Sequence, residues 1–138
     1  MIRCSTAAVY SESGWDWHLE KTYYPDWDQI VSSITRLDKF RYPWVWLFIG
    51  DADDDASVDC LTIMGGEGVY WLALTAGEYD QLRLFDSTKG TQEIKVWTSD
   101  QGYADEETHV TYDFDLVLLI AKHFGETGEP LPEASWDW

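Results

Sequence analysis

Three kinds of side chain in this 138-residue chain are suited to catalysis or metal binding: histidines, clustered carboxylates and cysteines. His18, His109 and His123 fall in three separate segments, and none has a partner at metal-ligand spacing or at the helical i, i+4 spacing. The sequence also lacks Gly-x-Ser-x-Gly, Gly-x-x-x-x-Gly-Lys and Pro-Cys-x-x-Cys, the signatures of a nucleophile elbow, a phosphate loop and a zinc nucleobase deaminase. We therefore expect ordinary surface or half-buried histidines, with no metal or cofactor.

The carboxylates of Asp51, Asp53 and Asp55 alternate along the chain and could converge on one hard cation such as Ca²⁺. The segment departs from an EF-hand loop twice, because Ala56 stands where a glycine makes the sharp turn and Thr62 stands where a bidentate Glu is needed. We expect a solvated acidic loop instead. A carboxylate pair for glycoside hydrolysis is not singled out either, because 26 acidic residues supply many possible pairs.

Cys4 and Cys60 are the only thiols and could form one disulfide. The first ten residues contain one basic residue and no apolar stretch of signal-peptide length, which favours two buried, reduced cysteines and a cytoplasmic location. The longest apolar runs, 44–49 and 116–121, are six residues each, whereas a membrane-spanning helix needs about 20. No membrane association is expected.

Two helices are predicted from capping residues and periodicity. Asp26 and Gln29 resemble a capping box, and Trp27, Ile30, Val31, Ile34 and Leu37 recur at helical spacing, which predicts a helix at about 26–38. Apolar residues from Phe114 to Phe124 recur in the same way, with Asp113 and Asp115 near the positive end of the helix dipole. This second helix is predicted at about 112–125, ending at Gly125 or Gly128.

Short β-prone runs fill most of the rest. They lie at 4–10, 15–22, 44–49, 58–64, 69–75, 81–86 and 93–99. Gly65-Gly66-Glu67-Gly68 is the strongest hairpin signal, because glycines can adopt the positive φ of a tight turn. The connections are too short for crossover helices, so the sheet should be antiparallel. We predict one α+β domain over 1–138, with two helices packed on a meandering antiparallel sheet and a polar loop at 100–109.

The net charge of −17 excludes some classes of partner. Such a chain repels a phosphate backbone and an anionic membrane surface, so neither nucleic acid nor membrane is expected to bind directly. The charge is uneven, with ten acids and a single base, Lys122, from position 99 onward. Solubility and helix-dipole complementarity account for about half of these acids. The remainder suggests a basic protein partner, such as one whose cleft normally holds nucleic acid.

Two acidic segments are the predicted contact sites for such a partner. They contain Asp53, Asp54 and Asp55 in the first segment, and Tyr103, Asp105, Glu106 and Glu107 in the second. The carboxylates would pair with Lys or Arg of the partner, and Tyr103 would serve as a rigid aromatic anchor.

Nine tryptophans suggest an alternative, a carbohydrate-binding module. Trp27 lies on the apolar face of a predicted helix, and Trp44, Trp46, Trp71 and Trp97 fall in predicted strands where aromatic residues pack well. The burial of the remaining four, Trp15, Trp17, Trp136 and Trp138, does not follow from any pattern. A further alternative is an acidic DNA mimic that inhibits a host nucleic-acid-binding protein.

The carboxy-terminal third carries a recognisable order of motifs. A helix ends in Ala121-Lys122-His123-Phe124, followed by Glu126-Thr127-Gly128, Pro130-Leu131-Pro132 and Ser135-Trp136. This order resembles the tail of the first-numbered immunity-protein family (immunity protein type one) of bacterial polymorphic toxin systems. The early helix and the Gly-rich hairpin fit the same pattern, so the resemblance covers roughly 26–138. The Trp-rich start at 10–24 and the extra Asp137-Trp138 depart from it.

The resemblance implies a small cytoplasmic α+β protein without enzymatic activity. Such a protein binds and blocks a cognate toxin, typically a nucleic-acid deaminase or a nuclease. Family membership would not reveal the contact residues, because these proteins vary their binding surface with the toxin.

Overall fold

The protein was analysed as a computed structural model that describes residues 1–13, 16–50, 59–76, 79–99 and 102–137. The described residues form strands, two α-helices and a short 3₁₀ helix. In chain order the elements are β1 (Thr6–Ser13), β2 (Asp16–Tyr23), α1 (Trp27–Thr35), β3 (Trp44–Ile49), β4 (Asp59–Gly66), β5 (Val69–Ala76), β6 (Tyr79–Leu84), β7 (Glu93–Trp97), β8 (Tyr103–Glu106), η2 (Glu107–His109), β9 (Val110–Thr111), α2 (Phe114–Thr127) and β10 (Trp136–Asp137).

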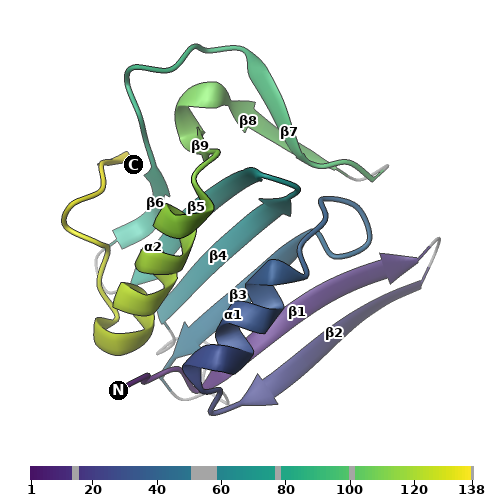
Figure 1. The fold of residues 1–138 in the computed structure, drawn as a ribbon, viewed down its shortest axis with the longest axis vertical. Helices are drawn as coiled ribbons and strands as arrows, with labels where there is room; N and C mark the ends of the chain where they lie inside the picture. The colour runs from purple at the N-terminus through teal and green to yellow at the C-terminus, as the bar shows by residue number, and fades with distance from the viewer. Residues whose placement is uncertain (14–15, 51–58, 77–78, 100–101, 138) are drawn as a thin grey trace.

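The main sheet has the strand order β10-β6-β5-β4-β3-β1-β2, and the short β9 also pairs with β5. Every pairing is antiparallel, and β3 to β6 are neighbours in chain order (Figure 1). Strands β7 and β8 form a separate two-stranded sheet. The predicted α+β class and the antiparallel meander are therefore confirmed. No helix among the described residues is long and apolar enough to cross a membrane.

Local signals set the helix starts. The Asp26 side chain accepts a hydrogen bond from the backbone N–H of Gln29, and the Gln29 side chain accepts one from the backbone N–H of Asp26, at 2.8 and 2.9 Å. This capping box starts α1 at Trp27, and the helix ends at Thr35, three residues before the predicted end. Helix α2 is capped by Asp113 at its start, and its C-cap is Gly128, whose φ of 76° is left-handed.

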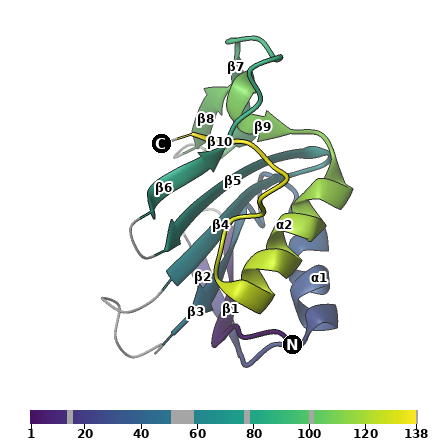
Figure 2. The same ribbon diagram turned by 90° about the vertical axis from the view of Figure 1, so that its left-hand side faces the viewer.

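Strand register divides the main sheet into two faces, because directly opposed residues in antiparallel strands point the same way. Val45, Ile63 and Leu72 are in register and are fully buried beneath the helices. Both helices lie on this one side of the sheet (Figure 2). Trp44, Met64 and Trp71 are in register on the opposite face, which we call the open face.

The β7–β8 hairpin covers one part of the open face. Val96 of β7 packs with Trp71, Ala73 and Val110 in a second, smaller core that is separate from the main core under the helices. The part of the open face formed by β1, β2 and β3 lies beside this hairpin and is not covered by the helices.

The loop predicted at 100–109 is wrong over residues 103–109. This segment forms β8 and the 3₁₀ helix η2, while residues 100 and 101 lie outside the described part of the chain. Residues Tyr103 to Glu106 form a strand because their backbone pairs with β7. This pairing does not require alternating apolar and polar side chains. The turn predicted at 11–14 is also wrong over residues 11–13, because β1 continues to Ser13, and residue 14 lies outside the described part of the chain.

Both cysteines are free thiols. Cys4 is buried and Cys60 is half-buried, so the expected full burial holds for Cys4 alone. Burial raises the pKa of Cys4 to about 11 and that of Cys60 to about 12. Both side chains are therefore protonated, weakly nucleophilic thiols at neutral pH.

Candidate functional site

The structure places the second predicted acidic segment on β8 and η2. Asp53, Asp54 and Asp55, the first predicted segment, lie outside the described residues. Tyr103 and Glu106 are exposed, Glu107 is half-buried, and the side chain of Asp105 is only 11% exposed. The expectation that all four present themselves to a partner therefore fails for Asp105.

Asp105 is held inside the chain by three neighbours. Its Oδ2 accepts hydrogen bonds from Trp71 Nε1 at 3.0 Å and from Arg83 Nη1 at 2.9 Å, and its Oδ1 lies 3.4 Å from His109 Nδ1. Burial by itself raises the pKa of this carboxyl, but the bond from Trp71, with the Glu106 backbone N–H, His109 and Arg83, holds the pKa below its ordinary value. Asp105 is thus a structural link between the open face and β8.

His109 extends this link to the last strand. The imidazole side chain is 7% exposed, and its Nε2 lies 3.1 Å from Asp137 Oδ2 on β10. Arg83 also approaches the Asp137 carboxylate, at 3.8 Å. The sequence analysis expected a surface or half-buried histidine, and the buried position between two carboxylates differs from that expectation. The described residues contain no cluster of three or more His, Cys, Asp or Glu that could hold a metal ion.

Glu107 is likewise engaged within the chain. Its carboxylate accepts hydrogen bonds from the Tyr112 hydroxyl at 2.8 Å, from the Gly90 backbone N–H at 3.2 Å and from the Gln92 side chain at 3.2 Å. These bonds hold the pKa of Glu107 below its ordinary value, with the Tyr112 bond the largest cause. Among the predicted residues on β8 and η2, Tyr103 and Glu106 are the most available for contact with a partner.

The open face carries an aromatic hollow of about 450 Å³ that the sequence analysis did not predict as a unit. Its lining, which defines the aromatic hollow, consists of Tyr10, Trp17, Leu19, Trp44, Trp46 and Trp97. Strand register explains why these residues meet: Tyr10 on β1 lies opposite Leu19 on β2 and opposite Trp44 on β3. Trp97 reaches the hollow from β7.

The rings in the aromatic hollow contact one another closely. Tyr10 stacks on Trp44 with ring centroids 3.9 Å apart and an interplanar angle of 9°. Trp97 meets Trp44 edge-on at 4.9 Å, and Trp17 lies nearly parallel to Tyr10 at 6.3 Å. Trp17 is 64% exposed, so part of this aromatic surface faces solvent.

Glu12 is an acidic residue that is hydrogen-bonded to two residues lining the hollow. It accepts hydrogen bonds from Trp97 Nε1 at 3.0 Å and from the Tyr10 hydroxyl at 3.2 Å. Desolvation raises the pKa of Tyr10, and the neighbouring Glu12 raises it further, so this phenol remains protonated and donating at neutral pH. The Glu12 carboxylate therefore holds in place two aromatic rings of the hollow, one from β1 and one from β7.

The alternation of apolar and charged residues in β2 and the Trp44-x-Trp46 spacing in β3 were the available sequence signals for this hollow. Alternation shows that Trp44 and Trp46 share a face, but not which face. In the structure they are half-buried on the open face, whereas Val45 and Leu47 fill the main core. The proximity of Tyr10, Trp17 and Trp97 depends on long-range pairing that one sequence does not reveal.

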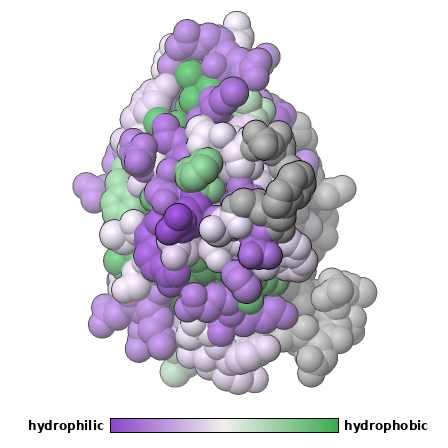
Figure 3. All heavy atoms as spheres, turned by 90° about the vertical axis from the view of Figure 1, so that its right-hand side faces the viewer, coloured by the Kyte–Doolittle hydropathy of each residue, from purple (hydrophilic) through white to green (hydrophobic). Residues whose placement is uncertain are grey.

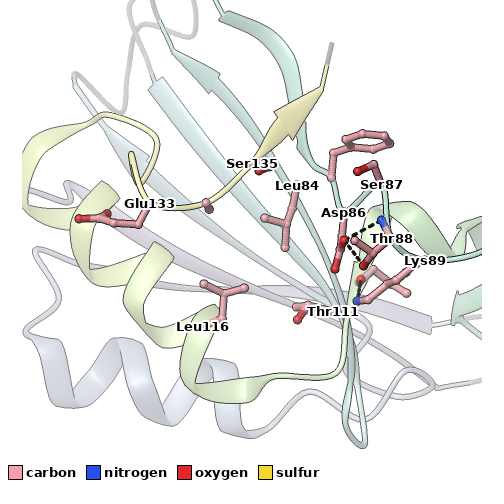
Figure 4. Close-up of a pocket in the computed structure, with 12 residues that line it drawn as sticks. Leu84, Asp86, Ser87, Thr88, Lys89, Thr111, Leu116, Glu133 and Ser135 are labelled. Carbon is pink, nitrogen blue, oxygen red and sulfur yellow. Dashed lines mark hydrogen bonds between the residues drawn. The ribbon is translucent and has the colours of Figure 1, made fainter.

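A second cavity, of about 530 Å³, lies between the loop after β6 and the segment before β10 (Figure 4). Two of its charged side chains, Asp86 and Lys89, already have partners within the chain. Asp86 accepts bonds from the backbone N–H and the hydroxyl of Thr88, at 3.0 and 2.6 Å, and Lys89 Nζ donates to the Val110 carbonyl. The aromatic hollow, with its exposed ring surface, is the stronger candidate for a binding site.

Comparison of the chain with protein families, with curated proteins and with solved structures finds no match. The resemblance to the first-numbered immunity-protein family therefore remains a prediction.

Proposed function

We propose that this chain is an immunity protein that binds and inhibits a cognate bacterial toxin with a basic active-site cleft, such as a nucleic-acid deaminase or nuclease. It acts in the cytoplasm, has no catalytic activity of its own, and excludes the nucleic-acid substrate by occupying the cleft. The order of motifs in the carboxy-terminal third is the sequence basis for this proposal.

The aromatic hollow is the single structural observation that carries the proposal. Clustered Trp and Tyr side chains on a rigid sheet are the residues that most often dominate binding energy at protein interfaces. A net charge of −17 accelerates encounter with a basic partner and disfavours acidic ones. Together these features suit a protein partner with a positively charged surface.

The predicted acidic segment fits beside this hollow. Trp97, which lines the hollow, is the register partner of Tyr103 on β8. Tyr103 is 38% exposed and packs edge-on against Trp71 with ring centroids 5.2 Å apart. Tyr103 and Glu106 can thus contribute to the same interface as the hollow, with Asp105 supporting them from inside.

The distribution of hydrophilic and hydrophobic residues on the surface is consistent with an interface of charged and aromatic residues. It does not suggest one large hydrophobic interface. On the side of the molecule shown in Figure 3, hydrophilic residues and residues of intermediate hydropathy together cover most of the described surface, and hydrophobic residues form small separate patches. The outer strand β2 contains Asp16, His18, Glu20 and Lys21, charged or polar residues of the kind that discourage non-specific strand pairing.

The test uses the carboxy-terminal domain of the protein encoded by the gene immediately upstream. We expect this domain to bind the chain, to lose its activity on nucleic acid when bound, and to have a basic surface. Replacing both Trp17 and Trp46 by Ala should weaken binding by roughly 30-fold or more, because each truncates a clustered aromatic contact. Binding is measured by calorimetry and inhibition by a nucleic-acid cleavage or deamination assay.

The matched control is Leu119→Ala, which truncates an exposed apolar residue of α2 on the helix side of the sheet. It should change affinity less than about two-fold. The proposal is wrong if the upstream domain does not bind or remains fully active when bound. Inhibition of a host nucleic-acid-binding protein in its place would support the DNA-mimic alternative.

A carbohydrate-binding module remains the second candidate, favoured by the exposed ring of Trp17 above the aromatic hollow. Trp136 is a weaker support, because it is half-buried and its Nε1 donates to the Leu131 carbonyl at 3.0 Å. Trp15 and Trp138 lie outside the described residues. If sugars bind, titration with common oligosaccharides should change tryptophan fluorescence in the native chain and not in Trp17→Ala. No change with any sugar would remove this candidate.

A further inference from the structure

The aromatic hollow is lined by the exposed Trp17 ring beside the close stack of Tyr10 on Trp44. Strand β1 lies between β2 and β3, so Tyr10 has Trp44 on one side and Trp17 on the other. The Tyr10 and Trp44 rings are in direct contact, with centroids 3.9 Å apart. The Tyr10 and Trp17 rings are tilted by 18°, with centroids 6.3 Å apart.

A centroid distance of 6.3 Å is within the ordinary range for an aromatic pair, so Tyr10 and Trp17 already form a stacked pair. The outer ring, Trp17, is 64% exposed and lines the hollow, so it can stack on a planar group that enters from solvent. Tyr10 is held in place by its stack on Trp44 and its bond to Glu12.

The electrostatics of the hollow favour a cation. Aromatic faces carry partial negative charge, and none of the six lining residues is charged. Tyr10 and Trp97 both donate hydrogen bonds to the Glu12 carboxylate, which polarises their rings toward greater negative charge. Each Glu12 oxygen accepts one such bond and retains a second lone pair for an incoming donor.

Three nearby residues carry the opposite charge. Arg41 and Lys39 lie beside the hollow through their carbonyls, which accept hydrogen bonds from the backbone N–H groups of Glu12 and Thr98 at 2.9 and 2.8 Å. Lys21 is the third. Lys21 lies in the same row of the open face as Trp46, with Ala8 between them. Its exposed ammonium group adds a positive charge beside the hollow. Lys21 is one row away from the Tyr10 and Leu19 pair, whereas Glu12 is hydrogen-bonded to Tyr10 itself. Because the Glu12 carboxylate is the charged group bonded to the ring walls themselves, it favours a positively charged group at this end of the hollow.

We propose that the aromatic hollow takes an arginine side chain of a basic protein partner, stacked on Trp17 and paired with Glu12, the register partner of Trp17. The planar guanidinium can stack on an exposed indole face, and its fork of N–H donors reaches the free lone pairs of a carboxylate. A lysine ammonium supplies charge without a plane to stack. The inference rests on the proposed function only for the identity of the partner, because the site itself is defined by the chain.

The direct probe is a capped pentapeptide, Gly-Gly-Arg-Gly-Gly, compared with its citrulline counterpart at constant ionic strength. Citrulline keeps the planar shape and removes the charge. Binding is followed by the indole N–H signals of the ¹⁵N-labelled chain. We expect the arginine peptide to shift the signals of Trp17 and Trp97, and the citrulline peptide to bind roughly two- to thirty-fold more weakly.

Three variants test which residues of the hollow bind the arginine peptide. Trp17→Ala and Glu12→Gln should each weaken the arginine peptide, whereas Lys21→Gln should strengthen it. Glu12→Gln retains a carbonyl acceptor for the Trp97 or Tyr10 bond, so it separates the loss of charge from the loss of structure. Leu119→Ala, on α2, should leave peptide binding unchanged.

Equal binding of the two peptides, or unchanged binding by Trp17→Ala and Glu12→Gln, would overturn the inference. The outcome for the upstream toxin domain is separate. If that domain binds the native chain and Trp17→Ala equally well, the arginine site is wrong and the proposed function stands. If the arginine peptide binds as expected but the toxin domain does not, the site stands and the proposed function fails.

Discussion

Replacing Asp105 by Asn should lower the free energy of unfolding by about 2–4 kcal/mol. The carboxylate is 11% exposed and accepts from Trp71 Nε1 and Arg83 Nη1 at 3.0 and 2.9 Å. Asn keeps one acceptor oxygen but removes the charge that partners Arg83 and faces His109. The expected loss is below the largest values for broken buried ion pairs because Arg83 still has Asp137 at 3.8 Å. Urea denaturation followed by tryptophan fluorescence measures the effect.

The matched control for this variant is Glu106→Gln, the adjacent acid, whose side chain is exposed. It should change the free energy of unfolding by no more than about 0.5 kcal/mol. If Asp105→Asn is as stable as Glu106→Gln, the carboxylate does not link β8 to the sheet. If it is stable but binds the toxin domain poorly, Asp105 is a partner contact, as the sequence analysis predicted.

The same carboxylate should make the native chain sensitive to acid. The pKa of Asp105 is lower in the folded chain than its ordinary value of 3.8, so the folded state favours the charged form. Its contribution is complete above about pH 4 and is lost as the pH falls through the folded pKa. Below pH 4 the native chain should therefore lose stability more steeply than Asp105→Asn. Parallel curves for the two proteins would contradict this assignment.

Replacing Gly66 by Ala should destabilise the fold by roughly 2–5 kcal/mol. Gly66 has a φ of 140°, and a Cβ added there would lie 2.5 Å from the Leu37 carbonyl group and from the Asp38 backbone nitrogen. The chain after α1 crosses the start of the β4–β5 hairpin at this point, and Asp38 forms a β-bridge with Gly66. A methyl group must therefore push two backbones apart.

Gly68→Ala provides the comparison within the same hairpin. Gly68 has a φ of 86°, but no atom lies within 4 Å of an added Cβ. Only backbone strain remains, which costs about 1–2 kcal/mol for a left-handed residue. Thermal and urea unfolding of both variants should rank Gly66→Ala as less stable. Equal losses would mean that the crossing of the 37–38 segment over the hairpin is loose.

Local sequence signals were sufficient for the helices and for most of the sheet. The Asp26 and Gln29 capping box predicted the start of α1, and the left-handed Gly128 ends α2 as one of the two predicted alternatives. The glycine hairpin fixed the β4–β5 register, with Gly66 opposite Val69. Short connections then implied antiparallel neighbours, as observed from β3 to β6.

The rest of the site depends on contacts between distant segments. His109 is buried because Asp105 and Asp137 face its two nitrogens, and nothing near His109 in sequence indicates the second carboxylate. The segment of strand β8 was predicted as loop because it is polar, acidic and bounded by Gly102. Its pairing with β7 decides its conformation. The aromatic hollow needs Glu12 to meet Trp97, which lies 85 positions further along the chain.

The two faces of the main sheet should also be under different selective constraints. Substitutions at Val45, Ile63 or Leu72 alter the packing beneath the helices, so purifying selection for folding should act on them. Changes at the exposed Trp17 leave that packing untouched. If the proposed function is right, the open face can therefore diversify under selection from a changing partner while the helix-covered face keeps the fold.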